Sequence, residues 1–539
     1  MKAGFVGLFL VFLLGGSFVF AVDLKQGEKL AKVQSFTYNA AAAPASLDPG
    51  KAEGTPEGVF IRSLFETLVT LDANDKLMPG VALSWEHSDD YKTWTFYLRK
   101  NAKWSNGDPV TAHDFVFAWR RILDPKTGSP SASYLLQMKL RNSEDVLNGK
   151  KDPRELGLVA KDDYTLTLDL EGSVPFAGLL AASHVLSPVP RKVVEKLGDS
   201  WIDTKNLVGN GAFKLDYFAL NEEAVFSKNP HYWDANNVVL DKLTLLQIAS
   251  ESVAFTRYRS GALDVSAYPL ELFEKVKREY PSELLQVPTL CTYYYEFNYA
   301  KPIFRDSKVR SALSMSMDRQ VLIDKILKQG RLPAYNFTPP YANMAHAITP
   351  PEWSRWDDKK RYEEAKRLLL EAGYSKAKPL QFTLRYNTNE GHKQLAIAVS
   401  SMWKKNLDGM VKVKLQNLEW RTFLSERRLG THEMSRGGWC SGYNEASAFL
   451  YVMLSDSSNN TGKYNNPDFD AALQAAYQSN TDEERAAKYA LAEDILQGDF
   501  ALIPLYFYTV SELVKPYVRG YVNRPSRAHY FKDIYILEH

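Results

Sequence analysis

The chain has 539 residues, of which 45% are hydrophobic and 24% are charged, and its formal net charge is +2 at pH 7. This length exceeds what one hydrophobic core usually supports, so two or three packed domains are expected, and the composition is that of a globular rather than a disordered protein. Because basic and acidic residues are interspersed, the sequence lacks the basic stripe of a nucleic-acid-binding protein and the polybasic tract of a lipid-binding one.

The N-terminus has the pattern of an export signal. Lys2 precedes an apolar run over residues 5–20, and residues 19–21 (VFA) fit the small-residue rule for signal peptidase. A transmembrane anchor is the alternative, but the run is short for a membrane span. No Cys follows the run, so a lipid anchor is not indicated. The sequence predicts a signal peptide over residues 1–21, cleaved near Ala21.

Strand and helix patterns are mixed along the rest of the chain. Alternating apolar residues predict strands, whereas helical spacing with capping residues predicts helices. Thr481 and Glu484 form a capping box for the last predicted helix. The predicted strands are 93–99, 164–170 and 410–415, and the predicted helices are 318–328, 357–372, 392–407 and 483–496. No internal repeat or long linker divides the chain, so we expect α/β architecture with interleaved domains.

The sequence contains two cysteines, Cys291 and Cys440. An exported chain enters an oxidising compartment, where an even number of cysteines favours a disulfide. Metal binding is the weaker alternative, because neither cysteine has a second Cys or His at ligand spacing. We therefore predict a structural disulfide between the two.

No motif indicates catalysis. The sequence has no GxSxG, HExxH or Walker A motif and no GxGxxG after a predicted strand. The nine histidines are scattered without metal-ligand spacing. A glycosidase-like carboxylate pair is left open, because acidic residues are abundant. Binding without catalysis, cofactor or metal is the favoured interpretation.

A series of short blocks gives a more specific indication. In chain order they are 47–49 (LDP), 64–68 (LFETL), 79–82 (PGVA), 94–99 (WTFYLR), 103–107 (KWSNG), 111–115 (TAHDF), 209–212 (GNGA), 291–296 (CTYYYE), 439–440 (WC), 455–460 (SDSSNN) and 513–516 (LVKP). In these blocks the chain resembles the oligopeptide-binding branch of the bacterial extracellular solute-binding proteins, family 5. The resemblance covers essentially the whole mature chain.

The resemblance implies an α/β, two-lobed periplasmic binding protein fold of type II, in the large three-domain peptide-binding class. Lobe I would comprise residues 22–65, 191–290 and 509–539, with domain II (66–190) inserted into it, and lobe III would comprise residues 291–508. It also implies a periplasmic monomer without cofactor, which closes around a short peptide or peptide-like ligand and docks on the membrane permease of an ABC importer. No nucleic acid is expected as a partner.

The resemblance further implies the residues that contact the ligand. Two backbone segments match strands that pair with the ligand: Glu53, Gly54 and Thr55, and Gly438, Trp439 and Cys440. Three basic residues match positions near the ligand carboxylate, where a guanidinium can bind as a fork: His392, Arg427 and Arg436. Five positions match the lining of side-chain pockets: Glu296, Trp420, Leu424, Asn459 and Tyr508.

Several positions depart from the family pattern, including Ser131, where a pocket tyrosine is common, and residues 264–269, a segment shorter than its counterpart; two departures bear on charge. Family members that bind peptides have an aspartate two residues after the cleft cysteine, which pairs with the ligand's α-ammonium; here that position is Gly442. Either Glu53 or Glu445 replaces this acid, or the ligand has no free amino group there. Arg428 stands where the family has a histidine, which adds positive charge to the cleft.

The sequence therefore predicts a periplasmic peptide-binding component of an ABC importer. The first alternative is a specialised relative that binds an acidic or amino-blocked ligand, such as a murein peptide. A secreted hydrolase and a chaperone-like holder of unfolded chains are more remote alternatives.

Overall fold

The computed structural model describes residues 24–539 except Gln26, Asn74, Gln329, Asn480, Asn523 and Arg527. The predicted signal peptide and its cleavage near Ala21 therefore lie outside the described residues. Among the residues described, no helix is both long enough and apolar enough to cross a membrane.

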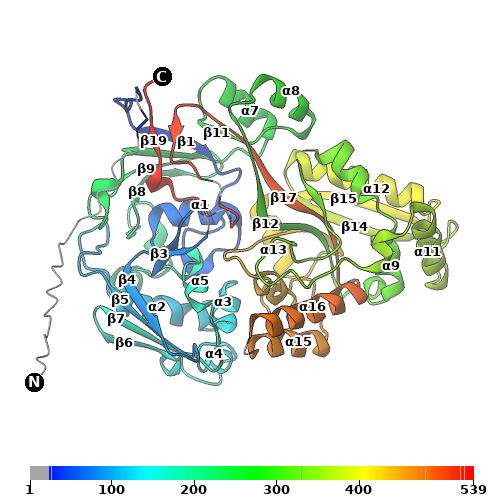
Figure 1. The fold of residues 1–539 in the computed structure, drawn as a ribbon, viewed down its shortest axis with the longest axis horizontal. Coiled ribbons are helices and arrows are strands. Elements are labelled where there is room, and N and C mark those ends of the chain that lie inside the picture. The colour runs from blue at the N-terminus through cyan, green and yellow to red at the C-terminus, as the bar shows by residue number, and fades with distance from the viewer. Residues whose placement is uncertain are drawn as a thin grey trace, which may run out of the picture.

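One large mixed sheet runs through the molecule. Its strand order is β15-β14-β16-β12-β17-β11-β1-β10-β9-β8, and β13 (Leu332–Pro333) also pairs with β17. The other bounds are β1 Ser35–Asn39, β8 Phe213–Ala219, β9 Glu223–Lys228, β10 Lys242–Leu246, β11 Val265–Ser266, β12 Leu284–Phe297, β14 Leu380–Asn387, β15 Val411–Leu418, β16 Met434–Cys440 and β17 Leu502–Val514. The long strands β12 and β17 cross the middle of the molecule (Figure 1).

Smaller elements complete the left part of the molecule, which we define by residues 24–280 and 515–539 (Figure 1). An antiparallel sheet has the order β4-β5-β7-β6, and two-stranded sheets join β2 to β3 and β18 to β19. The strands are β2 Val69–Leu71, β3 Leu77–Pro79, β4 Ala82–His87, β5 Thr93–Leu98, β6 Leu158–Asp162, β7 Thr165–Asp169, β18 Val518–Arg519 and β19 Tyr535–Ile536. The helices are α1 Thr55–Leu64, α2 Ala112–Leu123, α3 Ala132–Gln137, α4 Ser143–Leu147, α5 Ala177–Ala181, α6 Arg191–Leu197, α7 Glu251–Arg259 and α8 Phe273–Glu279.

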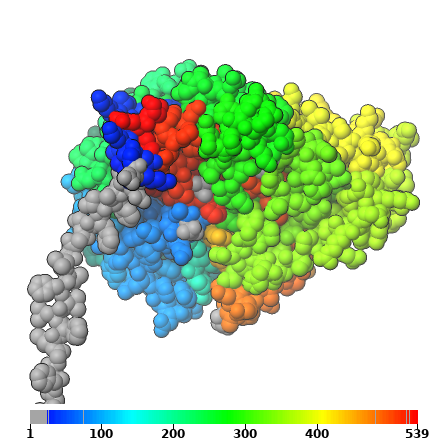
Figure 2. Space-filling model, turned by 45° about the horizontal axis from the view of Figure 1, so that its top comes forward, coloured from blue at the N-terminus to red at the C-terminus, as the bar shows by residue number. Residues whose placement is uncertain are grey.

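The right part, residues 299–500, carries helices around β14, β15 and β16 (Figure 1). They are α9 Ser307–Met315, α10 Arg319–Val321, α11 Asp358–Glu371, α12 Glu390–Asn406, α13 Trp420–Arg428, α14 Ser447–Leu450, α15 Pro467–Tyr477 and α16 Asp482–Gly498. Trp403 of α12 is fully buried, and its indole Nε1 donates to the Leu313 carbonyl at 2.8 Å. The space-filling view shows the left and right parts in contact (Figure 2).

Most predicted elements are confirmed. The predicted strands are β5, β7 and β15, and three of the predicted helices are α11, α12 and α16. As expected, Thr481 caps α16 by accepting from the Glu484 N–H at 3.1 Å. Residues 318–328 differ from the prediction, because α10 is one short turn followed by a π-helix, Leu322–Leu327. Arg319 at the start of α10 is buried and donates to the Ala334 and Pro504 carbonyls, a tertiary anchor that periodicity does not reveal.

The predicted disulfide is confirmed. Cys291 of β12 and Cys440 of β16 face each other in the strand pairing and are joined as a disulfide that spans 149 residues of sequence. It lies beside an interruption in the pairing of β12 with β17, between Pro288 and Thr292. The disulfide therefore links β16 to β12 at the point where the pairing of β12 with β17 is interrupted.

Candidate functional site

Strand β16 has one open edge. Along its length it pairs with β12, from Cys291↔Cys440 to Phe297↔Met434. On its other side β14 pairs only at Met434 and Ser435. In the described part of the chain, the backbone from Arg436 to Cys440 thus has no strand partner on that edge. Unpaired N–H and C=O groups on a strand edge can accept a further extended chain.

The segment before α1 meets α13 across the two parts of the molecule. Glu53 Oε2 lies 3.3 Å from Arg428 Nε, and Trp420 Nε1 donates to Glu57 Oε1 at 3.4 Å. Gly54 is required here, because a Cβ would lie 2.5 Å from the Trp420 ring carbon Cζ2. Burial raises the pKa of Glu53, and the charges of Arg428 and Arg427 oppose that rise. Four predicted site residues, Glu53, Gly54, Trp420 and Arg428, therefore form one contact between the parts.

Arg436 lies in an aromatic cluster. Its Nη2 donates to Tyr508 Oη at 2.8 Å, and its guanidinium carbon lies 5.1 Å from the centre of the Tyr293 ring. Within the described residues, no carboxylate oxygen lies within 4 Å of Arg436. A Cβ at Gly438 would lie 2.8 Å from Arg436 Nη2, so the glycine leaves room for this side chain. The arrangement can bind an anion.

His392 and Arg331 belong to the same cluster. The His392 ring lies 5.5 Å from Tyr293, and the Arg331 guanidinium lies 4.9 Å from the Tyr506 ring. Burial, together with the charges of Arg436 and Arg331, holds the pKa of His392 well below its usual value, so the imidazole is neutral. The sequence reasoning missed Arg331. A lone arginine after Gly330 gives no local signal of where its side chain will lie.

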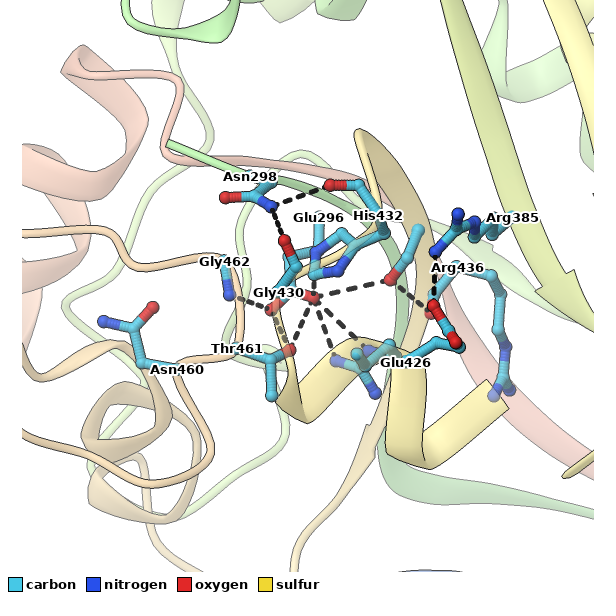
Figure 3. Close-up of polar contacts among 12 residues, drawn as sticks. Glu296, Asn298, Arg385, Glu426, Gly430, His432, Arg436, Asn460, Thr461 and Gly462 are labelled. Atoms are coloured by element: carbon cyan, nitrogen blue, oxygen red, sulfur yellow. Dashed lines mark hydrogen bonds and ion pairs between the residues drawn. The ribbon is translucent and has the colours of Figure 1, made fainter. Parts of the chain in front are cut away.

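Arg427 has a different environment from Arg436. Its Nη2 lies 3.1 Å from Glu296 Oε2. The Glu296 carboxylate also accepts from Thr461 Oγ1 and from the Gly462 N–H at 3.0 Å (Figure 3). Burial raises the pKa of Glu296, but the charge of Arg427 and the hydrogen bonds from Thr461 and Arg427 lower it below its ordinary value. The positive charge of Arg427 is thus neutralised inside the protein.

His432 completes this network without contributing charge. It is fully buried, and its Nε2 lies 3.5 Å from Glu296 Oε2 (Figure 3). Burial lowers the pKa of His432 to about 4, although Glu296 opposes this shift. Figure 3 also shows Asn298, which donates to the carbonyls of Gly430 and His432 and so fixes the loop before β16.

The remaining predicted residues lie around the end of β16. Trp439 Nε1 donates to the Ala448 carbonyl at 2.6 Å, and its ring packs 5.5 Å from Tyr451. Asn459 Nδ2 donates to Ser133 Oγ at 2.8 Å, which joins the right part to α3 in the left part. Leu424 is buried within α13, and Thr55 is exposed at the first turn of α1.

Each acid proposed as a replacement at Gly442 has a cationic neighbour, although Glu53 Oε2 accepts no hydrogen bond from the described residues. Glu53 is paired with Arg428, as described above. Glu445 accepts from Tyr489 Oη at 2.8 Å and lies 3.5 Å from Arg485 Nε. It is buried, and burial raises its pKa to about 7. Both carboxylates already have cationic partners within the protein.

Comparison with known proteins gives matches over nearly the whole chain. Residues 76–461 match the family model described as the middle part of bacterial extracellular solute-binding proteins, family 5. The periplasmic oligopeptide-binding protein OppA of Haemophilus influenzae is 48% identical over 96% of each chain. The periplasmic murein peptide-binding protein MppA of Escherichia coli is 41% identical over 97% of each chain.

Solved structures of both relatives resemble this one. The complex of Haemophilus influenzae OppA with RPPGFSPFR has a TM-score of 0.93, covering 95% of this chain and 100% of that one. Escherichia coli MppA has a TM-score of 0.92, covering 95% and 100%. The unliganded open form of MppA has a TM-score of only 0.66 at the same 41% identity, covering 96% and 99%. The predicted fold class is confirmed, and the two parts are arranged as in the peptide complex rather than as in the open form.

Proposed function

The chain belongs to the bacterial extracellular solute-binding proteins, family 5, and we propose that it encloses a short peptide between its two parts and delivers it to the permease of an ABC importer. Its relatives are named as periplasmic binding proteins. We propose that it acts in the periplasm as a monomer, after cleavage near Ala21, and that it returns its ligand unchanged.

The open edge of β16 is the observation that carries this proposal. A peptide lying along Arg436–Cys440 could add a strand there, because its backbone is the same whatever its side chains. The segment from Glu53 to Thr55 would cover the peptide from the other side, and Arg428 and Trp420 would hold that segment in place. Main-chain pairing of this kind supplies affinity without demanding one sequence.

Arg436 and His392 would receive the carboxyl end of the ligand. Arg436 has unused hydrogen-bonding capacity, since its Nε is buried without a hydrogen-bond partner. Arg331 would add a second positive charge to this end. In contrast, we assign Arg427 and Glu296 to holding the site together rather than to contacting the ligand, because they satisfy each other.

The proposed domain boundaries follow from the crossing strands. The interruption of the β12–β17 pairing between Pro288 and Thr292 falls where lobe I (22–65, 191–290 and 509–539) would meet lobe III (291–508). Opening by rotation of the lobes would bend the two strands there, and residues 66–190 would move with lobe I as domain II. Hinges of this kind need only a few residues that absorb the backbone change.

Titration of the protein, freed of ligand by unfolding and refolding, tests the proposal. Trp420 lies at the contact between the parts, so its fluorescence should report closure over di- to hexapeptides of mixed sequence. A Trp420→Phe variant provides the matched control for the origin of the signal. We expect saturable binding, and mass spectrometry should recover every peptide intact. Absence of binding by any peptide, or cleavage of the bound peptides, contradicts the proposal.

A further inference from the structure

Hydroxyl groups surround Gly442, two residues beyond the open edge of β16. A Cβ at Gly442 would lie 3.8 Å from Ser183 Oγ and 4.0 Å from Tyr134 Oη, the only atoms of the described residues within 4 Å apart from its own chain neighbours. The Tyr134 ring packs 5.9 Å from the Tyr451 ring, and the Tyr134 hydroxyl lies beside those of Ser183 and Tyr451. We call Tyr134, Ser183 and Tyr451 the hydroxyl cluster. Each of its groups can both donate and accept hydrogen bonds.

Burial raises the pKa of Tyr134 in this cluster, and the positive charge of Arg62 opposes that rise. Arg62, in the last turn of α1, has its Nη2 3.1 Å from Nδ1 of His184, the residue next to Ser183. Among the residues described, no carboxylate oxygen lies within 4 Å of Arg62, and its Nε is buried without a hydrogen-bond partner. Burial and Arg62 hold the pKa of His184 well below its usual value, so His184 is neutral and adds no second positive charge.

Among the described residues, no carboxylate oxygen lies within 4 Å of the position that a Cβ at Gly442 would take. Glu445 accepts a hydrogen bond from Tyr489 and forms an ion pair with Arg485, and Glu53 forms an ion pair with Arg428. A ligand ammonium against Gly442 would therefore lose its water without gaining a carboxylate there. This loss of hydration disfavours a buried cation strongly.

We infer, on the basis of the proposed function, that the ligand end lying against Gly442 carries no positive charge and that the protein selects peptides whose α-amino group is acylated. An acylated amine is an amide, whose N–H and C=O can be satisfied by the hydroxyls of Tyr134 and Ser183. Free-amine peptides bind more weakly, because their ammonium meets only neutral hydroxyl groups there and no carboxylate.

A matched pair of ligands tests the inference: one tetrapeptide with a free α-amine, and the same tetrapeptide N-acetylated. Calorimetric titration of the full-length mature protein should give at least tenfold tighter binding of the acetylated form. Gly442→Asp should shift this preference at least tenfold toward the free amine, because the new carboxylate fits beside the hydroxyl cluster. Gly442→Asn is the uncharged control of the same size and should keep the wild-type order.

The outcomes separate the inference from the proposed function. Equal affinities, or tighter binding of the free amine by the wild-type protein, would overturn the inference and leave peptide binding intact. Failure of both peptides to bind would overturn the two together. The inference would also be overturned if Gly442→Asn shifted the preference as far as Gly442→Asp. The size of the side chain, and not its charge, would then determine which peptide binds more tightly. Melting temperatures of both variants check that they remain folded.

Discussion

Arg428 Nε lies 3.3 Å from Glu53 Oε2, so an ion pair connects α13 in the right part to the segment before α1 in the left part. The Glu53 side chain is largely buried, whereas the Arg428 side chain is 44% exposed. Solvent therefore screens the pair, and its contribution is modest. Its position matters more than its strength, because the pair exists only when the two parts are in contact.

Removing this pair should favour the open arrangement. We expect Arg428→Gln and Glu53→Gln to increase the radius of gyration of the ligand-free protein in X-ray scattering. A double-mutant cycle on peptide affinity should give a coupling of about 0.5–1 kcal/mol, as for half-exposed ion pairs. Glu426→Gln, on the same helix, is the control. Additive effects of the two substitutions would show that the pair does not link closure to binding.

Arg436→Gln should weaken binding of peptides with a free carboxyl end. The loss of a charge-assisted hydrogen bond costs about 1.5–3 kcal/mol, or roughly 10- to 100-fold in affinity. The same peptides with a C-terminal amide should lose far less, because they lack the charge that Arg436 would bind. Titration of both peptide forms measures the difference. An equal loss for acid and amide would mean that Arg436 does not meet the carboxylate.

Arg427→Gln should act on stability instead of specificity. Without Arg427, the buried Glu296 carboxylate loses its cation, and breaking such a pair costs about 3–5 kcal/mol. Urea unfolding should show this loss, and Glu296→Gln combined with Arg427→Gln should recover part of it. If the single variant keeps full stability and loses affinity only for acidic peptide ends, Arg427 binds ligand and the assignment is wrong.

Glu445 should make stability depend on pH. Its folded pKa of about 7 lies above the ordinary value of 4.5, so the folded state binds more protons than the unfolded state between these values. The free energy of unfolding should therefore fall as pH rises from about 4.5 to 7, by up to about 3 kcal/mol from this group. Urea unfolding across this range should give a flatter profile for Glu445→Gln. The exposed Glu483→Gln serves as control, and an unchanged slope in Glu445→Gln would refute the role of Glu445.

Reduction of the Cys291–Cys440 disulfide should destabilise the protein. The bond closes a loop of about 149 residues, for which chain entropy gives about 5 kcal/mol. Urea unfolding of Cys291→Ser/Cys440→Ser against the oxidised wild type measures this difference. Alkylation of the unreduced exported protein should detect no free thiol. Two alkylated cysteines before reduction would contradict the bond.

Local patterns in the sequence were sufficient for much of the fold. The alternation in residues 93–99 and the cap at Thr481 depend on neighbours in sequence, so β5 and α16 are predicted from sequence alone. The disulfide was predicted from the oxidising compartment that an exported chain enters and from the even number of cysteines. The π-helix at Leu322–Leu327 was not predictable, because Arg319 beside it is held by carbonyls from distant segments.

The site, like the fold, could be predicted only in part from the sequence. Gly442 and Arg428 could be singled out by their departure from a family pattern, but their surroundings could not. Only the fold shows that Arg427 is neutralised by Glu296, whereas Arg436 has no carboxylate beside it in the described part of the chain. Arg331 and Arg62 were missed because they approach the site from the segment before β13 and from the end of α1, with no motif around either residue.

The most direct test of peptide capture is mass spectrometry of the material released by denaturing protein exported through its own signal peptide. The account predicts short peptides, of varied sequence and near one per protein molecule, with blocked amino ends over-represented. Release of a single compound without peptide bonds, or of nothing above a mock purification, would contradict the claim that this protein encloses peptides.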